Sequence, residues 1–506
     1  MAADKEAPAR RAPIDLDARA FRAAGHALVD QIADYLERLP GLPVTRGESP
    51  RAVRNALGRG SLPEQGRPMD ELLAEVTPLL VEHSLHNGHP RFWGYITSSA
   101  NPAGALADLL AAAVNPNLGR WDIAPIASEI EAQTVRWLAE LVGYPADCGG
   151  ILTSGGNMAN FLAFVAARRA QASWDIRREG LYGEPRKLAA YVSADAHTWV
   201  DKAADVSGLG SDAVRWVSTD RQQRMRPDDL ATLIRSDRRA GLLPFLVVGT
   251  AGTTGTGAID PLPELAELAR RERLWFHVDG AYGAPAATLP EAPAELRGLA
   301  LADSLALDPH KWLYAPLEAA CCLVRDPQAL PDAFSFQPSY YKLDRRADDG
   351  RPGINYYQYG MQNSRGFRAL KVWLGLRQTG RRGIARMIGE DIALARRLYE
   401  LTAEHPDLEA RSHSLSITTF RYQPRELSGH GEALAPYLNE LNERLLDELQ
   451  RSGRAFVSNA VVAGDYLLRA CIVNFRSSAA DIDALPGIVC EIGEALDARL
   501  RPAALR

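Results

Sequence analysis

A lysine in the segment SLALDPHKW has the position in the chain that most suggests chemistry. Lys311 follows an apolar run, residues 304–308, and a turn that contains Pro309. A lysine held at the end of a buried strand is partly removed from water, which suits it to forming a Schiff base with a carbonyl compound. Taken alone, the simpler explanation is a solvated turn lysine.

An aspartate occupies the matching position one strand earlier. Asp279 ends the apolar run LWFHVD and lies 32 positions before Lys311. A strand, a helix and a second strand between them would place both side chains in one crevice. Pyridoxal phosphate needs a carboxylate against its ring nitrogen, because the protonated ring is the electron sink for a carbanion at the substrate Cα. By itself, Asp279 could also be a helix N-cap or one half of a loop ion pair.

Two further segments offer what such a cofactor requires. The run LTSGGNMANF, residues 152–161, reads as a glycine-rich turn that opens a helix. Free backbone N–H groups and the helix dipole at Gly156 and Asn157 could hold a phosphate, although the turn could also be an ordinary helix start. His197, in SADAH, could lie flat over the cofactor ring or be a half-buried structural histidine.

The elements that must position these residues are apolar runs separated by helical stretches. The runs cover residues 188–194, 245–251, 274–279 and 304–308. Continuous apolar runs of this length indicate buried parallel strands with crossover helices, which predicts an α/β core. Sites in open α/β sheets lie outside the carboxyl ends of the strands, so the polar residues that follow these runs are expected to face one crevice.

The remaining chain divides around this core. At 506 residues and 55.2 kDa, the protein is too long for one hydrophobic core, since domains seldom exceed ~300 residues. Residues 1–13 read as a disordered tail, and helical periodicity appears from Phe21 to Leu36 and from Met69 to His83. We predict a long loop at residues 338–359. After it, we expect helices at 363–379, 384–403 and 434–451, and strands at 414–422 and 466–475, which together form a smaller α+β lobe.

The composition excludes several classes of protein. Hydrophobic residues make up 46% and charged residues 24%, as in an ordinary folded protein. Lysine and arginine total 58 against 63 acidic residues, so the net charge of -5 gives no general attraction to nucleic acid or to an anionic membrane. Five scattered cysteines, a charged N-terminus and the absence of any long apolar stretch favour a cytoplasmic protein with no export signal and no membrane span.

Competing site motifs are missing. The run GTAGTTGTG, residues 249–257, lacks the spacing of a dinucleotide loop, and neither a P-loop, H-E-x-x-H nor G-x-S-x-G occurs. His83, His86 and His89 could suggest a metal, but Gly88 and Pro90 break the helix that would align them. We therefore expect no metal site.

Taken together, these motifs resemble the group II pyridoxal-phosphate-dependent decarboxylases, which include aromatic-L-amino-acid, histidine and glutamate decarboxylases. The resemblance runs from about Phe21 to Ser477, and the block D-P-H-K-W is its most specific part. It implies fold type I of the pyridoxal-phosphate enzymes: a large domain on a mostly parallel seven-stranded sheet and a smaller α+β C-terminal domain. The expected division is 14–100 as a helical segment packing on a dimer partner, 101–380 as the large cofactor domain and 381–506 as the small domain.

The resemblance also implies roles for single residues. Lys311 would bind pyridoxal phosphate covalently, Asp279 would contact the ring nitrogen and His197 would stack on the ring. The other residues implied to contact the cofactor are Gly156, Asn157, Thr254, Ala281, Asp308 and His310. Tyr340 would deliver the proton to the substrate Cα after carbon dioxide leaves, although Tyr341 is adjacent and could hold this role instead.

A substrate pocket follows from the same resemblance. The residues implied to line it are Trp93, Tyr95, Ile96, Thr97, Ser98 and His310, with Leu118, Trp121 and residues 364–368 approaching from a second subunit. The implied assembly is a homodimer with shared active sites. Three positions depart from the common pattern: Asn157 replaces Ser or Thr, Asp308 replaces the Asn of animal members, and Gly366 replaces Arg. Each of these departures lies at a position that the resemblance assigns to the cofactor or the substrate side of the site.

The activity expected from the resemblance is decarboxylation of an L-amino acid to the amine. Trp93 and Tyr95 favour an aromatic substrate, although both could be core residues. An acidic substrate would need a cation, for which Arg91 and Arg120 are candidates. The alternatives are an aldehyde synthase, which couples decarboxylation to oxidative deamination, an aminotransferase, and a cofactor-binding protein without activity.

Overall fold

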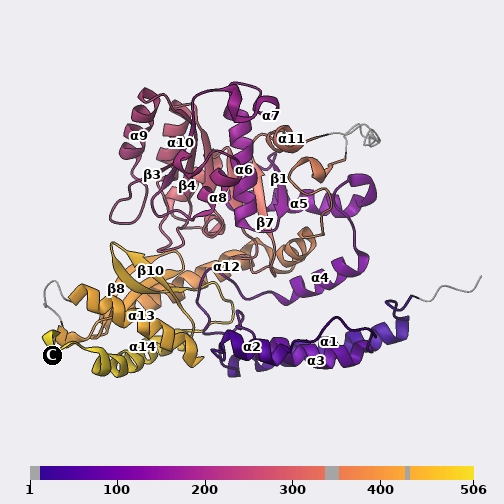
Figure 1. The fold of residues 1–506 in the computed structure, drawn as a ribbon, viewed down its shortest axis with the longest axis vertical. Coiled ribbons are helices and arrows are strands. Elements are labelled where there is room, and N and C mark those ends of the chain that lie inside the picture. The colour runs from indigo at the N-terminus through magenta and orange to yellow at the C-terminus, as the bar shows by residue number, and fades with distance from the viewer. Residues whose placement is uncertain (1–11, 337–352, 428–433, 506) are drawn as a thin grey trace, which may run out of the picture.

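Two lobes make up the part of the chain that the structure describes. The computed structural model describes residues 12–336, 353–427 and 434–505. A large lobe is built on a seven-stranded sheet and a small lobe on a four-stranded sheet, and the long helix α12 (Ala369–Glu404) lies between them (Figure 1).

The sheet of the large lobe is mostly parallel, as the sequence predicts. Its strands are β1 (Gly149–Thr153), β2 (Leu188–Ser193), β3 (Val214–Val217), β4 (Leu243–Thr250), β5 (Trp275–Asp279), β6 (Ser304–Leu307) and β7 (Ala320–Val324). Their order is β1-β7-β6-β5-β4-β2-β3. Only β7 runs antiparallel to its neighbours, β1 and β6. The predicted runs correspond to β2, β4, β5 and β6, whereas β1, β3 and β7 are not separately recognised from the sequence.

Helices cover both faces of this sheet. They are α4 (Pro102–Val114), α5 (Pro125–Val142), α6 (Gly156–Gln171), α7 (Ile176–Glu179), α8 (Trp199–Val206), α9 (Pro227–Arg239), α10 (Leu262–Arg271) and α11 (Ala329–Phe334). Alternate strand residues enter two separate apolar clusters, one with α5, α9, α10 and α12 and the other with α6, α8 and α11. Because both faces are buried, each strand is a continuous apolar run.

The small lobe is an antiparallel sheet covered by helices. Its strands are β8 (Leu408–Ser414), β9 (Ile417–Tyr422), β10 (Ser458–Val462) and β11 (Asp465–Cys471), in the order β10-β11-β9-β8. Helices α13 (Leu434–Ser452) and α14 (Ala479–Leu500) contribute to its apolar core. This confirms the predicted α+β character of the C-terminal part.

Helix α12 joins the two lobes. The sequence predicts two helices, at 363–379 and 384–403, and α12 does consist of two helical parts separated by a kink at Gly380. Gly380 has φ +66°, which glycine adopts without the steric penalty of a side chain. The helix packs against α4 and α5 of the large lobe and against β8, β9 and α14 of the small lobe.

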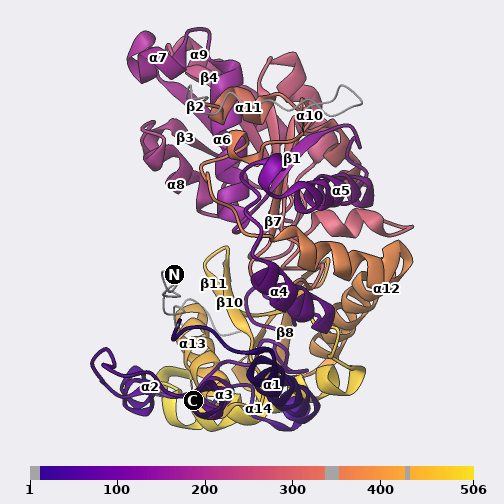
Figure 2. The ribbon, with the colours of Figure 1, turned by 90° about the vertical axis from the view of Figure 1, so that its right-hand side faces the viewer.

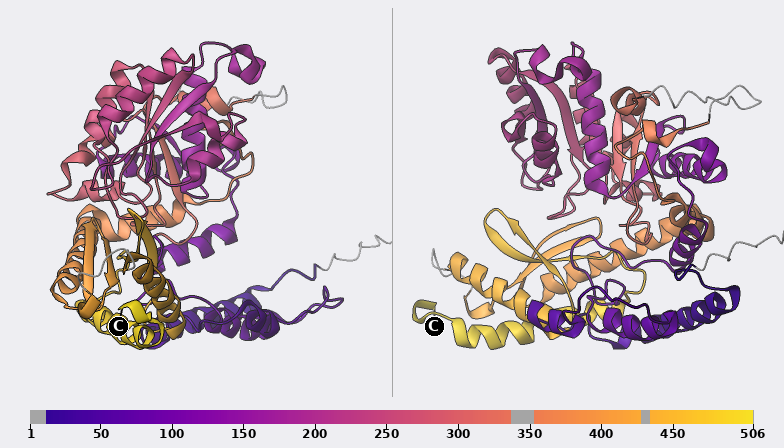
Figure 3. Two further views of the ribbon diagram at one scale, coloured as in Figure 1. Left: turned by 60° about the vertical axis from the view of Figure 1, so that its left-hand side comes forward. Right: turned by 45° about the vertical axis from the view of Figure 1, so that its right-hand side comes forward.

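The N-terminal segment is helical, as expected. Its helices are α1 (Ala18–Arg38), α2 (Pro50–Leu57) and α3 (Met69–Glu82), and none of them contains a buried residue. Helices α1 and α3 lie side by side at the end of the molecule farthest from the large sheet (Figures 2 and 3). Among the described residues, none of the helices combines the length and the apolar character that crossing a bilayer requires.

A buried ion pair fixes the edge of the large sheet next to the glycine-rich turn. Strand β1 is an edge strand, and the N–H of Leu152 donates to Oε1 of Glu131 at 2.9 Å. The carbonyl of Leu152 accepts from Nη2 of Arg365 at 2.6 Å. Arg365 and Glu131 also bond to each other at 2.6 Å, and their side chains are 1% and 0% exposed. The pair therefore bonds to both backbone groups of Leu152, the N–H and the carbonyl, just before the turn at 154–156.

Removing one member of this pair is expected to destabilise the fold. Arg365→Met leaves Glu131 as an uncompensated buried charge, so the free energy of unfolding should fall by ~3–5 kcal/mol. Urea unfolding at fixed protein concentration, followed by circular dichroism, measures this loss. The matched control is Arg368→Met, because its partner Glu318 is 46% exposed and such pairs contribute only ~0–1 kcal/mol. Equal losses in the two variants would contradict this account of Arg365.

Candidate active site

The lysine and its carboxylate neighbours meet at the carboxyl end of β6. Nζ of Lys311 lies 3.0 Å from Oδ2 of Asp308, whose side chain is 1% exposed. Burial alone lowers the pKa of the Lys311 ammonium, but the carboxylates of Asp308 and Asp279 outweigh this effect and hold the pKa above its ordinary value. The lysine is therefore stored as a cation, and it must lose a proton before it can attack a carbonyl carbon.

Asp279 is held by two donors at the end of β5. Its Oδ2 accepts from the indole N–H of Trp199 at 2.8 Å, and its Oδ1 accepts from the backbone N–H of Ala281 at 3.1 Å. Asp279 is only 8% exposed. These bonds fix the direction of the carboxylate, as a partner for a ring nitrogen requires.

His197 is positioned by the same tryptophan. Its Nδ1 accepts from the backbone N–H of Trp199 at 3.2 Å, so the proton of the neutral ring is on Nε2. Burial lowers the pKa of His197, and the negative charge of Asp279 opposes this in part. Trp199 is a residue that the sequence reasoning missed, because its contact with Asp279 spans 80 positions and leaves no local pattern.

The glycine turn forms a cradle at the start of α6. A Cβ atom added at Gly156 would lie 2.6 Å from Oδ2 of Asp308, so the backbone approaches this carboxylate as only glycine allows. The helix begins at Gly156, which leaves N–H groups available to an anion, and Asn157 is exposed beside it. The buried hydroxyls of Thr153 and Thr250, in the last residues of β1 and β4, have no hydrogen-bond partner.

The other residues predicted to contact the cofactor differ in their burial and in their hydrogen bonds. Ala281 is buried next to Asp279, and its carbonyl accepts from the N–H of Asp308 at 3.2 Å. Nδ1 of His310 accepts from the N–H of Ala319 at 3.1 Å, and burial lowers the pKa of His310. Thr254 is exposed in the loop after β4, whereas its neighbour Thr253 is buried and bonds to Thr256.

The predicted substrate segment reaches the lysine turn through a serine. Ser98 donates its hydroxyl to the carbonyl of His310 at 2.9 Å. Tyr95 is 56% exposed, and Ile96 and Thr97 between these residues are half-buried. Trp93 is fully buried in the core of the small lobe, and its indole N–H donates to Ser477. Its position gives it a packing role.

The residues expected to reach a second subunit have contacts within their own chain. Leu118 is 0% exposed in the single chain and packs with Ala124 and Ala127. Arg365, in the stretch 364–368, bonds to Glu131 within its own chain. Trp121 keeps partial exposure, and its indole N–H donates to Glu129 at 2.8 Å.

The candidate cations for an acidic substrate have other partners. Arg91 bonds to Asp481 and Arg120 to Asp122. A cation that the sequence reasoning missed is Arg469, which is 2% exposed and donates to the carbonyl of Tyr95 at 2.9 Å. Its Nε and Nη2 are buried without hydrogen-bond partners. Tyr340 and Tyr341, the two candidate proton donors, lie outside the described residues.

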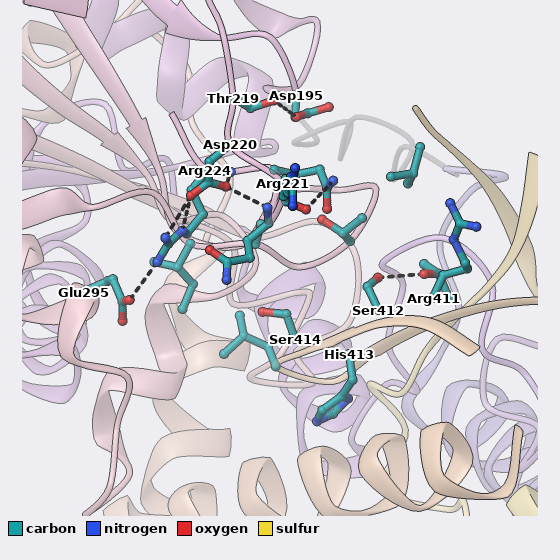
Figure 4. Close-up of a pocket in the computed structure, with 18 of the residues that line it drawn as sticks. Asp195, Thr219, Asp220, Arg221, Arg224, Glu295, Arg411, Ser412, His413 and Ser414 are labelled. Atoms are coloured by element: carbon teal, nitrogen blue, oxygen red, sulfur yellow. Dashed lines mark hydrogen bonds and ion pairs between the residues drawn. The ribbon is translucent and has the colours of Figure 1, made fainter. Parts of the chain in front are cut away.

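A large cavity lies near this site, between the two lobes (Figure 4). Its volume is about 1420 Å³, and it opens between the loop Thr219–Arg226 of the large lobe and residues 411–415 of the small lobe. Thr219 donates to Asp195, two residues before His197, and Arg224 pairs with Asp220 and Glu295. Neither Lys311 nor Asp279 lines this cavity, so it is not where their chemistry would occur.

The histidines of the N-terminal segment have separate partners. His83 contacts Glu48 at 2.7 Å, His86 contacts the Tyr35 hydroxyl at 3.1 Å, and His89 accepts from the N–H of Arg91. Within residues 12–336, 353–427 and 434–505, no group of three His, Cys, Asp or Glu side chains is arranged to hold a metal.

The assembled residues fit pyridoxal phosphate. A lysine suited to a Schiff base, an oriented carboxylate, an imidazole and a helix start meet at neighbouring strand ends. The buried threonine hydroxyls without partners add polar groups at the end of the sheet where a phosphate would bind.

Comparison with known proteins agrees with this chemistry. A family model described as the pyridoxal-dependent decarboxylase conserved domain matches residues 50–423. The chain is 34% identical over 466 residues to aromatic-L-amino-acid decarboxylase from Bacillus atrophaeus, covering 92% of this chain and 94% of that protein. It is 30% identical to phenylacetaldehyde synthase from Petunia hybrida, covering 90% of each. The crystal structure of Oryza sativa TDC with PLP and tryptamine superposes with a TM-score of 0.88 at 27% identity, covering 96% of this chain and 100% of that one.

The close approach at Gly156 predicts a selective loss of cofactor affinity. In Gly156→Ala the new Cβ displaces Asp308, which is buried and paired with Lys311, so the Kd for pyridoxal phosphate should rise about tenfold, or ~1.4 kcal/mol. Equilibrium titration by cofactor absorbance and protein fluorescence measures it. The matched control is Gly155→Ala, because a Cβ there meets nothing within 4 Å. Equal Kd values for the two variants would refute the role given to Gly156.

Proposed function

The chain belongs to the pyridoxal-dependent decarboxylase family, and from this premise we propose that it decarboxylates an aromatic L-amino acid to the corresponding amine. The observation that carries the proposal is the meeting of Lys311, Asp308 and Asp279 at the carboxyl ends of β5 and β6. When bound, pyridoxal phosphate supplies the electron sink that accepts the negative charge left at Cα as carbon dioxide departs.

The residues of the chain have distinct tasks in this reaction. Lys311 would hold the cofactor covalently. Asp279, oriented by Trp199, keeps a proton on the ring nitrogen by opposite-charge stabilisation. The N–H groups at the start of α6 hold the phosphate, and His197 covers one face of the ring.

Protonation at Cα decides which product forms. We assign this proton transfer to Tyr340 as general acid, with Tyr341 as the adjacent alternative. In the family that the sequence resembles, aldehyde formation accompanies replacement of the loop tyrosine or the stacking histidine. Both Tyr340 and His197 are present here, which favours the amine, although one relative is named phenylacetaldehyde synthase.

Support for an aromatic substrate comes from the segment that precedes Ser98. The ring of Tyr95 is largely exposed, and its segment is bonded to the lysine turn through Ser98 and His310. The relatives named above include an aromatic-L-amino-acid decarboxylase. Arg91 and Arg120 are each bonded to an aspartate, so neither supports recognition of an acidic side chain.

We further propose a cytoplasmic homodimer with shared active sites. The five cysteines are all free, as in a reducing compartment. Helix α4 exposes Leu106, Leu109, Leu110 and Val114 by 51–68%, and α1 and α3 bury no residue in the single chain. Apolar surface of this extent on neighbouring helices supports an interface between subunits.

A product assay tests the function. The purified protein with pyridoxal phosphate is incubated with a panel of aromatic and acidic L-amino acids, and carbon dioxide, amine, aldehyde, keto acid and peroxide are measured. We expect equal amounts of amine and carbon dioxide from an aromatic substrate, no peroxide, and no product from Lys311→Ala. Tyr340→Phe should shift the product from amine towards aldehyde while cofactor binding is retained.

Each other outcome of this assay has a defined meaning. Keto acid without carbon dioxide would make the protein an aminotransferase. Aldehyde with peroxide from the wild type would make it an aldehyde synthase. If Tyr341→Phe changes the product and Tyr340→Phe does not, the proton donor is Tyr341.

A charge on α4 should separate the subunits. Leu110→Glu would place a carboxylate in the proposed apolar interface, so the dimer dissociation constant should rise by at least about tenfold. Sedimentation velocity over a range of concentrations measures it. Leu301→Glu is the control, because Leu301 is equally exposed, at 54%, on the large lobe away from α4. A wild-type protein that stays monomeric at all concentrations would refute the dimer.

A further inference from the structure

Asp391 is a buried carboxylate of α12 that has no part in the chemistry described above. It is 2% exposed. Its Oδ2 accepts from the indole N–H of Trp312 at 2.9 Å and from the hydroxyl of Tyr314 at 2.5 Å. Both donors belong to the turn that carries Lys311, one and three residues after it. A single carboxylate on the helix between the lobes thus holds this turn at two points.

Trp312 has a second contact that links it to the other catalytic strand. Its ring stacks on Tyr282, with 4.9 Å between ring centroids and 18° between planes. Tyr282 follows Asp279 by three residues, and its hydroxyl bonds to Ser416 in the small lobe at 2.6 Å. The stack therefore joins the turn after β5 to the turn after β6, and each side is anchored outside the large sheet.

The backbone of the lysine turn needs such support. Tyr314 has φ +56°, a left-handed conformation that costs a residue with a side chain of order 1 kcal/mol or more. Its carbonyl accepts from the backbone N–H and the side-chain amide of Asn101, both at 2.9 Å. A turn in this conformation persists only where surrounding contacts determine it. Asp391 supplies a hydrogen bond to the Tyr314 hydroxyl, and the Tyr314 ring packs edge-on against Phe475.

We propose that Asp391 is a positioning residue for Lys311. By bonding to Trp312 and Tyr314, it fixes the turn so that Nζ stays beside Asp308 and within reach of a cofactor whose ring lies against Asp279. The proposal rests on the assignment of Lys311 as the lysine that binds the cofactor. Its consequence is specific: the covalent link should depend on Asp391, whereas the phosphate and ring contacts should not.

The protonation of Asp391 sets the conditions of the test. Burial raises the pKa of Asp391 to about 7, and the bonds from Tyr314 and Trp312 oppose this. At pH 8 the carboxylate form, which accepts both bonds, predominates. The covalent link forms when the neutral Lys311 amine adds to the cofactor aldehyde carbon and one water molecule leaves, so it can be scored separately from non-covalent binding.

The experiment compares two ligands in four variants at pH 8. Pyridoxamine phosphate has no aldehyde, so its Kd reports the phosphate and ring contacts alone, whereas borohydride trapping of pyridoxal phosphate with mass spectrometry reports the link. Trp312→Phe keeps an aromatic ring for Tyr282 but loses the N–H donor, Tyr314→Phe loses the hydroxyl, and Asp391→Leu loses the acceptor. Asp391→Asn retains an acceptor oxygen and serves as the conservative variant.

We define the link constant as the equilibrium constant between covalently linked and non-covalently bound pyridoxal phosphate. It should fall about tenfold in Trp312→Phe, which loses one hydrogen bond to a charged group, and at least as much in Asp391→Leu, which loses both. Tyr314→Phe should show a similar fall, and Asp391→Asn should stay within about threefold of the wild type. The Kd for pyridoxamine phosphate should change less than about twofold in all of them. The matched control is Trp275→Phe, which removes a buried indole bond to Ser304 at the opposite end of β5 and should change neither quantity.

Two outcomes would overturn the proposal: an unchanged link constant in folded Trp312→Phe and Tyr314→Phe, or an equal loss of pyridoxamine phosphate affinity, which would mean a general structural role. If Asp391→Leu does not fold, the two phenylalanine variants still decide the question. Trapping of cofactor in Lys311→Ala would instead refute the lysine assignment, and with it the proposed function.

Discussion

The ion pair between Lys311 and Asp308 is the interaction on which the rest of the site depends. Two opposite charges 3.0 Å apart, with Asp308 almost fully buried, are stable only if the protein holds them in place, because removing charges from water is costly. That requirement explains the glycine at position 156, where a side chain would push Asp308 away. It also explains the raised pKa of Lys311, which keeps the lysine charged until a cofactor is present.

The residues around this pair form a layer that fixes directions. Trp199 bonds to Asp279 through its indole and to His197 through its backbone, so one residue orients two of the groups assigned to the cofactor. Glu131 and Arg365 complete the hydrogen bonds of the edge strand before the glycine turn. Asp391 bonds to the lysine turn from the helix between the lobes. Apart from the Trp199–His197 bond, these bonds join residues that are 21 to 213 positions apart.

Much of the large lobe could be predicted from the sequence. The runs at β2, β4, β5 and β6 are continuous and apolar because both faces of the sheet are buried, and this leaves a clear local signal. Strand β1 begins with two glycines, and β3 is an edge strand whose two central residues are not buried, so neither leaves such a signal. An aromatic residue near a polar segment gives the same local pattern whether it lines a pocket or fills a core, and the structure places Trp93 in the core of the small lobe.

The sequence by itself determined the chemistry: a lysine and an aspartate at successive strand ends, with a glycine turn at a helix start, point to pyridoxal phosphate. These features are local, since residue type and strand position are enough to define them. Only the tertiary structure decided which other groups orient them, namely Trp199, the pair of Glu131 and Arg365, and Asp391. The physical reason is that a buried polar group needs a hydrogen-bond partner, and the fold can supply that partner from any part of the chain. The number of residues between two groups does not show how close they are in space.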